Sequence, residues 1–152
     1  MAYAANLNLV CRVDGVLLAI PVHHVAETMR PRPVEPLTGA PPFVRGVSLI
    51  RGGPVPVVDA AALLGRSQRA PTRFVVLKTG THRVALAVSE VVGVRELAPE
   101  RLQGLPPLFG GAPADLVTSI GVLDEALLLV LESGRLVPES LWTSTEVGGS
   151  GP

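Results

Sequence analysis

Residues 46–59, GVSLIRGGPVPVVD, indicate the fold class more clearly than any other stretch of the chain. They contain two short apolar runs on either side of a Gly-Gly-Pro turn. In the first run, Val47 and Leu49 alternate with Ser48. Alternation of this kind is typical of a β-strand with one buried face, and two such runs joined by a glycine turn predict a β-hairpin.

Residues of the bend and of the second run carry more specific predictions. Pro56 cannot donate a ladder hydrogen bond, which places its strand at the edge of a sheet or at a bulge. Asp59 stands where the N-cap of a short helix would lie, and Gly65 would end that helix. Arg51 lies at the glycine-flanked bend, where a cation contributes little to folding. It is therefore a candidate contact residue, the alternative being an arginine that is simply solvated.

Turn residues divide the rest of the chain into short segments of the same kind. The Asp-Gly pair at residues 14–15 has the chemistry of a two-residue hairpin turn. Five prolines between residues 31 and 42 predict an extended surface connection. The pattern amounts to about ten short strands with few helices, and its two halves look alike. Strands outside the first hairpin are expected within residues 7–13, 16–22, 22–29 (after a helical turn), 73–88 (a hairpin), 91–97, 115–123 and 126–132.

Length and composition fit a single domain. At 152 residues the chain can bury a core, and 47% hydrophobic against 3% aromatic residues predicts that Val, Leu, Ala and Ile build it. The 13 Lys and Arg residues balance the 13 Asp and Glu residues, so no net field attracts nucleic acid or an anionic membrane. A single cysteine indicates a reducing compartment. No stretch has the length of a membrane span and the N-terminus lacks a signal-peptide pattern, so we expect a soluble cytoplasmic protein without membrane insertion.

Residue patterns typical of catalysis or cofactor binding are absent from the sequence. The paired glycines lack the spacing and the lysine of a phosphate-binding loop. His23 and His24 are adjacent, so an extended chain directs them to opposite faces and they are poor ligands for one metal. Cys11 lies in an alternating apolar run and is expected to be a buried, inert thiol. No nucleophile, base and orienting group form a set, and we expect a non-enzyme with no catalytic residue, metal or cofactor.

Several stretches, taken in order and spacing, resemble the CheW-like family of chemotaxis coupling proteins. They are IPVHHVAE at residues 20–27, the proline-rich connection, PPFVRGVSLIRGGPVPVVDAAALLG at residues 41–65 and RVALAVSEVVGV at residues 83–94. The resemblance extends from Leu7 to Leu141. It implies an all-β fold in which two five-stranded, SH3-like β-barrel lobes pack side by side, with short helical turns.

The expected organisation is one CheW-like domain over residues 1–142. Its first lobe comprises about residues 7–65, with a contribution from the C-terminal segment, and its second lobe about residues 73–132. Residues 143–152 are rich in Gly and Ser and are expected to form a disordered tail.

The resemblance also implies a function and a set of site residues. It implies a non-enzymatic adaptor between the cytoplasmic tip of a chemoreceptor and the regulatory domain of a CheA-type histidine kinase, located at receptor clusters in the cytoplasm. Val25, Glu27 and Arg51 match family positions implicated in receptor binding, and a further match, Gly46, is associated with the kinase. An apolar groove with one arginine and one glutamate would complement a coiled-coil tip. Val25 and Glu27 alternate with Ala26 and are expected on one face of an extended segment.

The second lobe departs from the family pattern in two places. Val88-Ser89 stands where the family commonly has Val-Asp, and Ser133 and Gly134 weaken the last Leu-rich segment. An adaptor that binds receptors but does not bind the kinase directly is therefore a second hypothesis. A third, from another class, is a small β-barrel enzyme or ligand carrier, which a closed pocket lined by convergent polar groups would favour.

Overall fold

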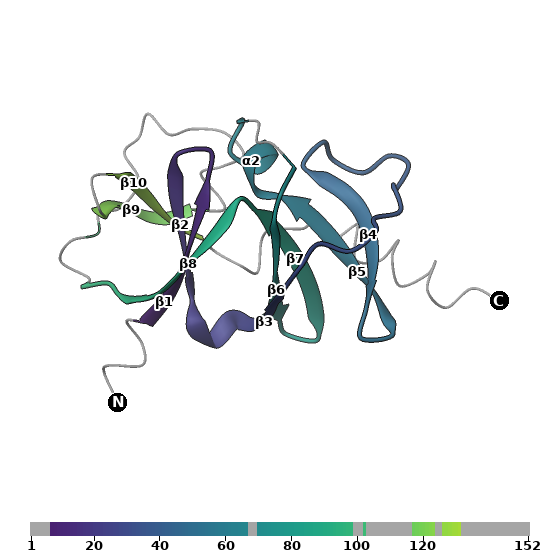
Figure 1. Ribbon diagram of the computed structural model, residues 1–152, viewed down its shortest axis with the longest axis horizontal. Helices are drawn as coiled ribbons and strands as arrows, with labels where there is room; N and C mark the ends of the chain where they lie inside the picture. Colours follow the sequence, from purple (N-terminus) through teal and green to yellow (C-terminus); the bar gives the residue numbers. More distant parts are fainter. Residues whose placement is uncertain (1–6, 67–69, 99–101, 103–116, 124–125, 132–152) are drawn as a thin grey trace.

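The computed structural model describes residues 7–66, 70–98, 102, 117–123 and 126–131. Within them, two five-stranded sheets lie side by side (Figure 1). Sheet A has the strand order β8-β1-β2-β10-β9, and sheet B has the order β3-β6-β7-β5-β4. The predicted all-β fold with two five-stranded lobes is confirmed.

The strands follow the segments predicted from sequence closely. Sheet A consists of β1 (Leu7–Val13), β2 (Val16–Pro21), β8 (Glu90–Glu96), β9 (Val117–Leu123) and β10 (Ala126–Leu131). Sheet B consists of β3 (Val25–Met29), β4 (Val44–Ile50), β5 (Gly53–Asp59), β6 (Arg73–Thr79) and β7 (His82–Val88). The turn of 3-10 helix η1 (Val22–His24) connects β2 to β3, and the one-turn helix α2 (Ala60–Leu63) follows β5.

The two sheets divide the chain differently from the expected lobes of residues 7–65 and 73–132. Sheet A takes its strands from residues 7–21, 90–96 and 117–131, whereas sheet B takes residues 25–88. Two parallel pairings cause this arrangement, because β2 pairs with β10 and β5 pairs with β7. Such pairings join strands that are distant in sequence, so local turn signals do not predict them.

Neither sheet closes into a barrel by hydrogen bonding in the described part of the chain. The ladders of sheet A end at β8 and β9, and those of sheet B end at β3 and β4. The lobes are thus curled, open sheets rather than the closed β-barrels that were expected. This leaves β3 and β4 as the edge strands of sheet B.

Three apolar clusters fill the fold, and the largest lies between the sheets. The shared cluster combines residues of β1, β2 and β10 with residues of β5, β6, β7 and α2. A smaller cluster belongs to sheet B alone and another to sheet A. Strands such as β7 contribute alternate residues to two clusters, so both of their faces are buried. This explains the runs of consecutive Val, Leu and Ala in the sequence.

The predicted hairpin over residues 46–59 is present as β4 and β5, with two differences. Its turn is Arg51-Gly52, and Gly53 already belongs to β5. Its buried face carries Ser48 (1% exposed), whereas Leu49 is 68% exposed. Ser48 can be buried because its hydroxyl group donates a 2.8 Å hydrogen bond to the carbonyl oxygen of Pro33.

The prediction for Pro56 is wrong, because β5 lies inside sheet B between β7 and β4. The irregularity in the β4–β5 ladder lies between Val44 and Gly46, so Pro56 is not at a bulge either. Pairing of β5 with β7 covers only Val57 to Asp59. Pro56 precedes that ladder, so its missing N–H group leaves the ladder intact.

Within the described residues, no helix is both long and apolar enough to cross a membrane. The tail predicted over residues 143–152 and the residues Ser133 and Gly134 lie outside the described residues.

Candidate interaction site at one end of sheet B

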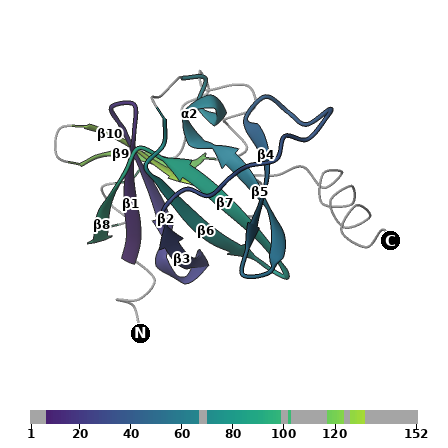
Figure 2. The same ribbon diagram turned by 45° about the vertical axis from the view of Figure 1, so that its right-hand side comes forward.

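Glu27 and Arg51 form an exposed ion pair that bridges two distant parts of sheet B. Arg51 Nη2 lies 2.7 Å from Glu27 Oε1, and Arg51 Nε lies 3.0 Å from Glu27 Oε2. Glu27 belongs to β3 and Arg51 to the β4–β5 turn, although β3 and β4 are opposite edges of the sheet. Figure 2 shows β3 and the β4–β5 turn at the same lower end of sheet B, where this ion pair joins the two edges of the sheet. A bidentate side-chain pair spans the gap that no ladder closes.

Arg51 owes its position to the turn that carries it. Arg51 has a φ of 53° and Gly52 a φ of 80°, and two successive positive φ values are characteristic of the type I′ turn of a tight hairpin. Glycine adopts this conformation readily, but a side chain such as that of Arg51 does so at a cost in strain. Its side chain is 74% exposed, so burial does not offset that cost. A strained, exposed arginine favours its interpretation as a contact residue.

Glu27 is directed toward Arg51 by a bulge in β3. Val25 pairs with Leu77 and Glu27 pairs with Val76, so Ala26 is an extra residue in this ladder. Leu77 and Val76 are adjacent in β6 and point to opposite faces of the sheet. The expectation that Val25 and Glu27 share a face is therefore wrong. Val25 packs against the core between the sheets, whereas Glu27 lies on the other face.

Arg51 also controls the protonation of Glu27. The hydrogen bond from Arg51 holds the pKa of Glu27 below its usual value of 4.5, and the charges of Arg51, Arg83 and Arg32 act in the same direction. The same hydrogen bond raises the pKa of Arg51. Both side chains are therefore charged at neutral pH, and the carboxylate of Glu27 is already satisfied before any partner arrives.

Gly46, the fourth predicted site residue, is buried in β4 rather than exposed. Its φ is 146°, and a Cβ atom at this position would lie 2.6 Å from the carbonyl carbon of Glu35 and 2.9 Å from Cα of Pro36. Glu35 in turn exchanges two 2.8 Å main-chain hydrogen bonds with Val47. The missing side chain thus lets the proline-rich connection lie directly along edge strand β4.

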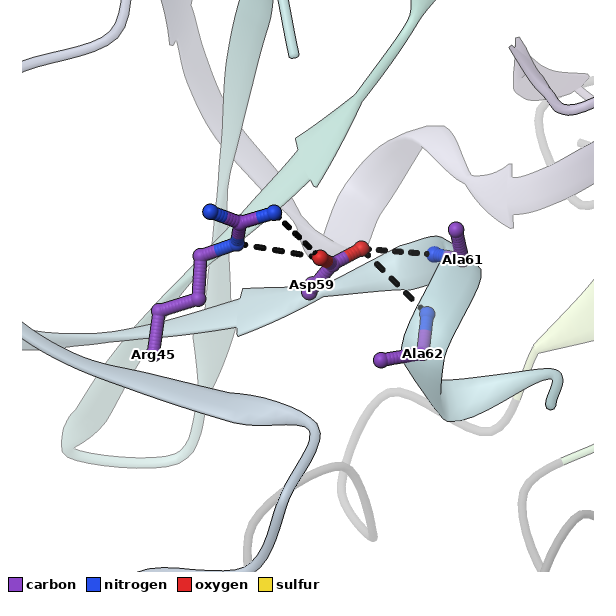
Figure 3. A network of polar contacts seen from close by, with 4 residues as sticks. All are labelled: Arg45, Asp59, Ala61 and Ala62. Atoms are coloured by element: carbon purple, nitrogen blue, oxygen red, sulfur yellow. Dashed lines mark hydrogen bonds and ion pairs between the residues drawn. The ribbon is translucent and has the colours of Figure 1, made fainter. Parts of the chain in front are cut away.

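A second polar network, which the sequence predicted only in part, joins β4 to helix α2 (Figure 3). The N-cap role of Asp59 is confirmed, since its Oδ1 accepts hydrogen bonds from the N–H groups of Ala61 (3.0 Å) and Ala62 (3.3 Å). Its Oδ2 accepts two more from Arg45, from Nε at 3.0 Å and Nη2 at 2.5 Å. Arg45 is the extra residue of the bulge between Val44 and Gly46, a feature that alternation alone does not reveal.

The chemical groups in the described part of the chain can be assessed one by one. Within the described residues, no three His, Cys, Asp or Glu side chains form a group that could hold a metal ion. Cys11 is buried as predicted, and burial raises the pKa of its thiol to about 12, so it is not a nucleophile at neutral pH. What the end of sheet B offers to a partner is exposed charge on rigid strands, beside an apolar residue at the junction of the sheets.

Comparison with known proteins gives one consistent result. Residues 8–140 match the family described as CheW-like domain. Protein FrzA of Myxococcus xanthus is 33% identical over 106 residues, and chemotaxis protein CheW of Klebsiella aerogenes is 28% identical over 107 residues. Each match covers 68% of this chain, but 65% and 64% of these two relatives, so the chain spans slightly less than two thirds of their length. Chemotaxis protein CheW of Thermotoga maritima is 26% identical over 131 residues, covering 84% of each protein.

A solved structure agrees with this result at the level of the fold. The crystal structure of the scaffolding protein TtCheW from Thermoanaerobacter tengcongensis matches with a TM-score of 0.74 over 88% of this chain and 97% of that chain, at 17% identity. The family match covers both sheets and the connection between them. The chain therefore belongs to the CheW-like domain family, the family of the chemotaxis coupling proteins.

Proposed function

We propose that this protein is a non-catalytic adaptor that couples methyl-accepting chemoreceptors to a CheA-type histidine kinase, at receptor clusters in the cytoplasm. The observation that carries the proposal is the exposed Glu27–Arg51 pair, because it occupies the positions that the family resemblance associates with receptor binding. Family membership and the names of the relatives, two of which are chemotaxis proteins, support the same function.

The receptor side of the proposal follows from the geometry of Arg51. The N–H group of Nε and one N–H group of Nη2 donate to Glu27, which leaves both N–H groups of Nη1 and the second one of Nη2 for oxygen atoms of the partner. Glu27 holds the guanidinium group in place, so less side-chain entropy is lost when a partner binds. Val25 would add apolar contact at the junction of the sheets, where it is half-buried. Arg51 is thus the proposed direct contact and Glu27 its positioning residue.

The kinase side rests on Gly46, whose proposed role is indirect. Gly46 holds the proline-rich connection against β4, and the surface formed by that connection is the one a kinase regulatory domain would contact. Ser89 departs from the family pattern. Its main-chain N–H group donates a 3.0 Å hydrogen bond to the carbonyl oxygen of Arg12, and its own carbonyl oxygen accepts a hydrogen bond from the hydroxyl group of Thr72. Any residue at this position could form the same main-chain hydrogen bonds, so the serine does not argue against kinase binding. We therefore favour an adaptor that binds the kinase directly over one that binds receptors alone.

A reconstitution of three components tests the proposal. A receptor signalling fragment, the cognate kinase and this protein are combined, and kinase autophosphorylation is measured with wild type and with Arg51→Ala. Arg95→Ala in β8, which removes an exposed arginine from the other sheet, is the matched control. We expect wild type and Arg95→Ala to make kinase activity receptor-dependent and Arg51→Ala to bind receptor about tenfold more weakly. Equal receptor binding by all three proteins, with the fold verified by thermal melting, would contradict the assigned role of Arg51.

A binary titration separates the two adaptor hypotheses. The kinase regulatory domain is titrated with this protein in the absence of receptor. Direct binding supports the coupling function. Receptor binding without any binary binding to the kinase would instead support the divergent adaptor.

A further inference from the structure

The hairpin of β6 and β7 places two like charges directly opposite each other. Lys78 pairs with Arg83 in the antiparallel ladder, one position before the pair that closes the hairpin. Both side chains are exposed. Directly opposed residues of an antiparallel pair point to the same face, with Cβ atoms about 5 Å apart, and like charges at that separation are destabilising. The free protein therefore carries an unfavourable interaction at this point.

This pair belongs to the same end of sheet B as the Glu27–Arg51 pair. Figures 1 and 2 both show the β4–β5 and β6–β7 turns at that end of the sheet. Glu27 lies opposite Val76 in the β3–β6 ladder, and Lys78 follows Val76 by two residues, so Lys78 and Glu27 share a face. The charge of Arg83 also acts on Glu27, which supports their proximity.

The positive charge of this end is only partly neutralised within the protein. In the described part of the chain, no ion pair includes Lys78 or Arg83. Both carboxylate oxygen atoms of Glu27 already accept hydrogen bonds from Arg51. The carboxylate of Glu27 is thus already engaged by Arg51, and an external anion would relieve the repulsion between Lys78 and Arg83.

We propose that Lys78 and Arg83 extend the receptor-binding site and dock acidic side chains on a helix of the chemoreceptor tip. This inference rests on the proposed receptor-binding function and names the chemistry of the partner surface. Two carboxylates three or four residues apart on a helix have Cβ atoms about 5–6 Å apart, which matches the spacing of a directly opposed pair on a sheet. This spacing argues for a protein helix as the partner, and Arg51 at the same end of sheet B adds a planar guanidinium donor that carboxylates accept.

The first test concerns the free protein and does not depend on any partner. Lys78→Glu converts the repulsive pair with Arg83 into an attractive one, and we expect its melting temperature to rise by about 1–3 °C. Arg73→Glu is the control, since Arg73 is exposed at the opposite end of β6 and lies opposite Val88. A lower melting temperature for Lys78→Glu than for Arg73→Glu would overturn the electrostatic premise.

The second test measures affinity for a receptor signalling fragment between about 50 and 300 mM salt. We expect Lys78→Ala/Arg83→Ala to bind about tenfold more weakly at low salt and to lose most of the salt dependence. The double variant Arg73→Ala/Arg95→Ala, which removes the same charge elsewhere, should bind like wild type. A receptor fragment whose acidic tip residues are changed to Gln and Asn should bind wild type as weakly as the unmodified fragment binds Lys78→Ala/Arg83→Ala.

The outcomes distinguish failure of this inference from failure of the proposed function. If wild type binds the fragment and Lys78→Ala/Arg83→Ala binds it equally well with the same salt dependence, the inference is wrong and the receptor function stands. If wild type does not bind the fragment at any salt concentration, both are wrong. If a duplex oligonucleotide competes with the fragment at equal concentration, the surface is a general anion site, and the commitment to acidic helices is wrong.

Discussion

Replacing Gly46 by alanine is the perturbation whose effect the structure determines best. The added Cβ atom would overlap the main chain of Glu35, which lies along edge strand β4. Main-chain atoms cannot rotate away as a flexible side chain can. The proline-rich connection would therefore have to leave β4. That movement would break both 2.8 Å hydrogen bonds between Glu35 and Val47 and the 2.8 Å bond from Ser48 to Pro33.

The loss of stability in Gly46→Ala has two contributions, backbone strain and lost hydrogen bonds, and a comparison with Gly93→Ala separates them. Gly46 and Gly93 have similar φ values of 146° and 139°, but nothing lies within 4 Å of a Cβ atom at Gly93. A side chain at such a φ costs about 1–3 kcal/mol at either position. Gly46→Ala additionally loses three hydrogen bonds at about 1 kcal/mol each. We expect it to lower the free energy of unfolding by about 3 kcal/mol more than Gly93→Ala does.

Urea unfolding of the two variants and wild type measures this difference directly. Equal destabilisation by Gly46→Ala and Gly93→Ala would show that the connection adapts without loss, and the close approach would then have no energetic role. Kinase binding by the folded fraction of each variant extends the test to function. Loss of kinase binding in Gly46→Ala alone supports an indirect role of Gly46 through the connection, whereas unchanged binding would contradict that role.

Three further predictions concern individual side chains. The pKa of Glu27, followed by NMR, should lie below 4.5 in wild type and rise in Arg51→Ala. The stabilisation from this ion pair is present at neutral pH and is lost as the pH falls through the lowered pKa of Glu27. Cys11 should not react with a thiol reagent in the native protein. The pKa of its thiol is about 12 in the folded protein against an ordinary 9.0, so between pH 9 and 12 the thiol ionises only in the unfolded chain. The free energy of unfolding should therefore fall by about 1.4 kcal/mol per pH unit in this range. Cys11→Ala should lack this slope. Asp59→Ala should cost about 1–2 kcal/mol in thermal unfolding through the lost cap, and Asp59→Asn, which keeps an acceptor, clearly less; equal losses would contradict the capping contribution.

Local features of the fold were predictable because their causes are local. An Asp-Gly pair specifies the β1–β2 turn, with φ values of 45° and 81° at Asp14 and Gly15, and a side-chain acceptor at Asp59 specifies the start of α2. The parallel pairings of β2 with β10 and of β5 with β7 have no such local cause. They follow from burying both faces of these strands, which many topologies would satisfy.

The candidate site shows the same limit at the scale of single residues. Arg51 could be singled out because a cation at a glycine bend has no folding role that the sequence reveals, whereas its pairing with Glu27 appears only in the structure. The opposite orientation of Val25 and Glu27 could not be predicted, because the extra residue Ala26 shifts all later residues of β3 to the other face of the sheet. The opposition of Lys78 and Arg83 was accessible in principle, because a two-residue turn after Thr79 fixes the register of that hairpin.

The open state of sheet B explains why the site can exist at all. If β3 and β4 were joined by a ladder, the β4–β5 turn would be held against β3 by main-chain hydrogen bonds. The structure instead joins these edges through Glu27 and Arg51, whose contribution depends on charge and exposure rather than on backbone register. An ion pair at a solvent-exposed position can exchange partners, whereas a ladder cannot do so without unfolding. A partner carboxylate that engages Arg51 would therefore act on a polar contact between the two edges of sheet B, which also share an apolar cluster through Ile50, Ala26 and Met29.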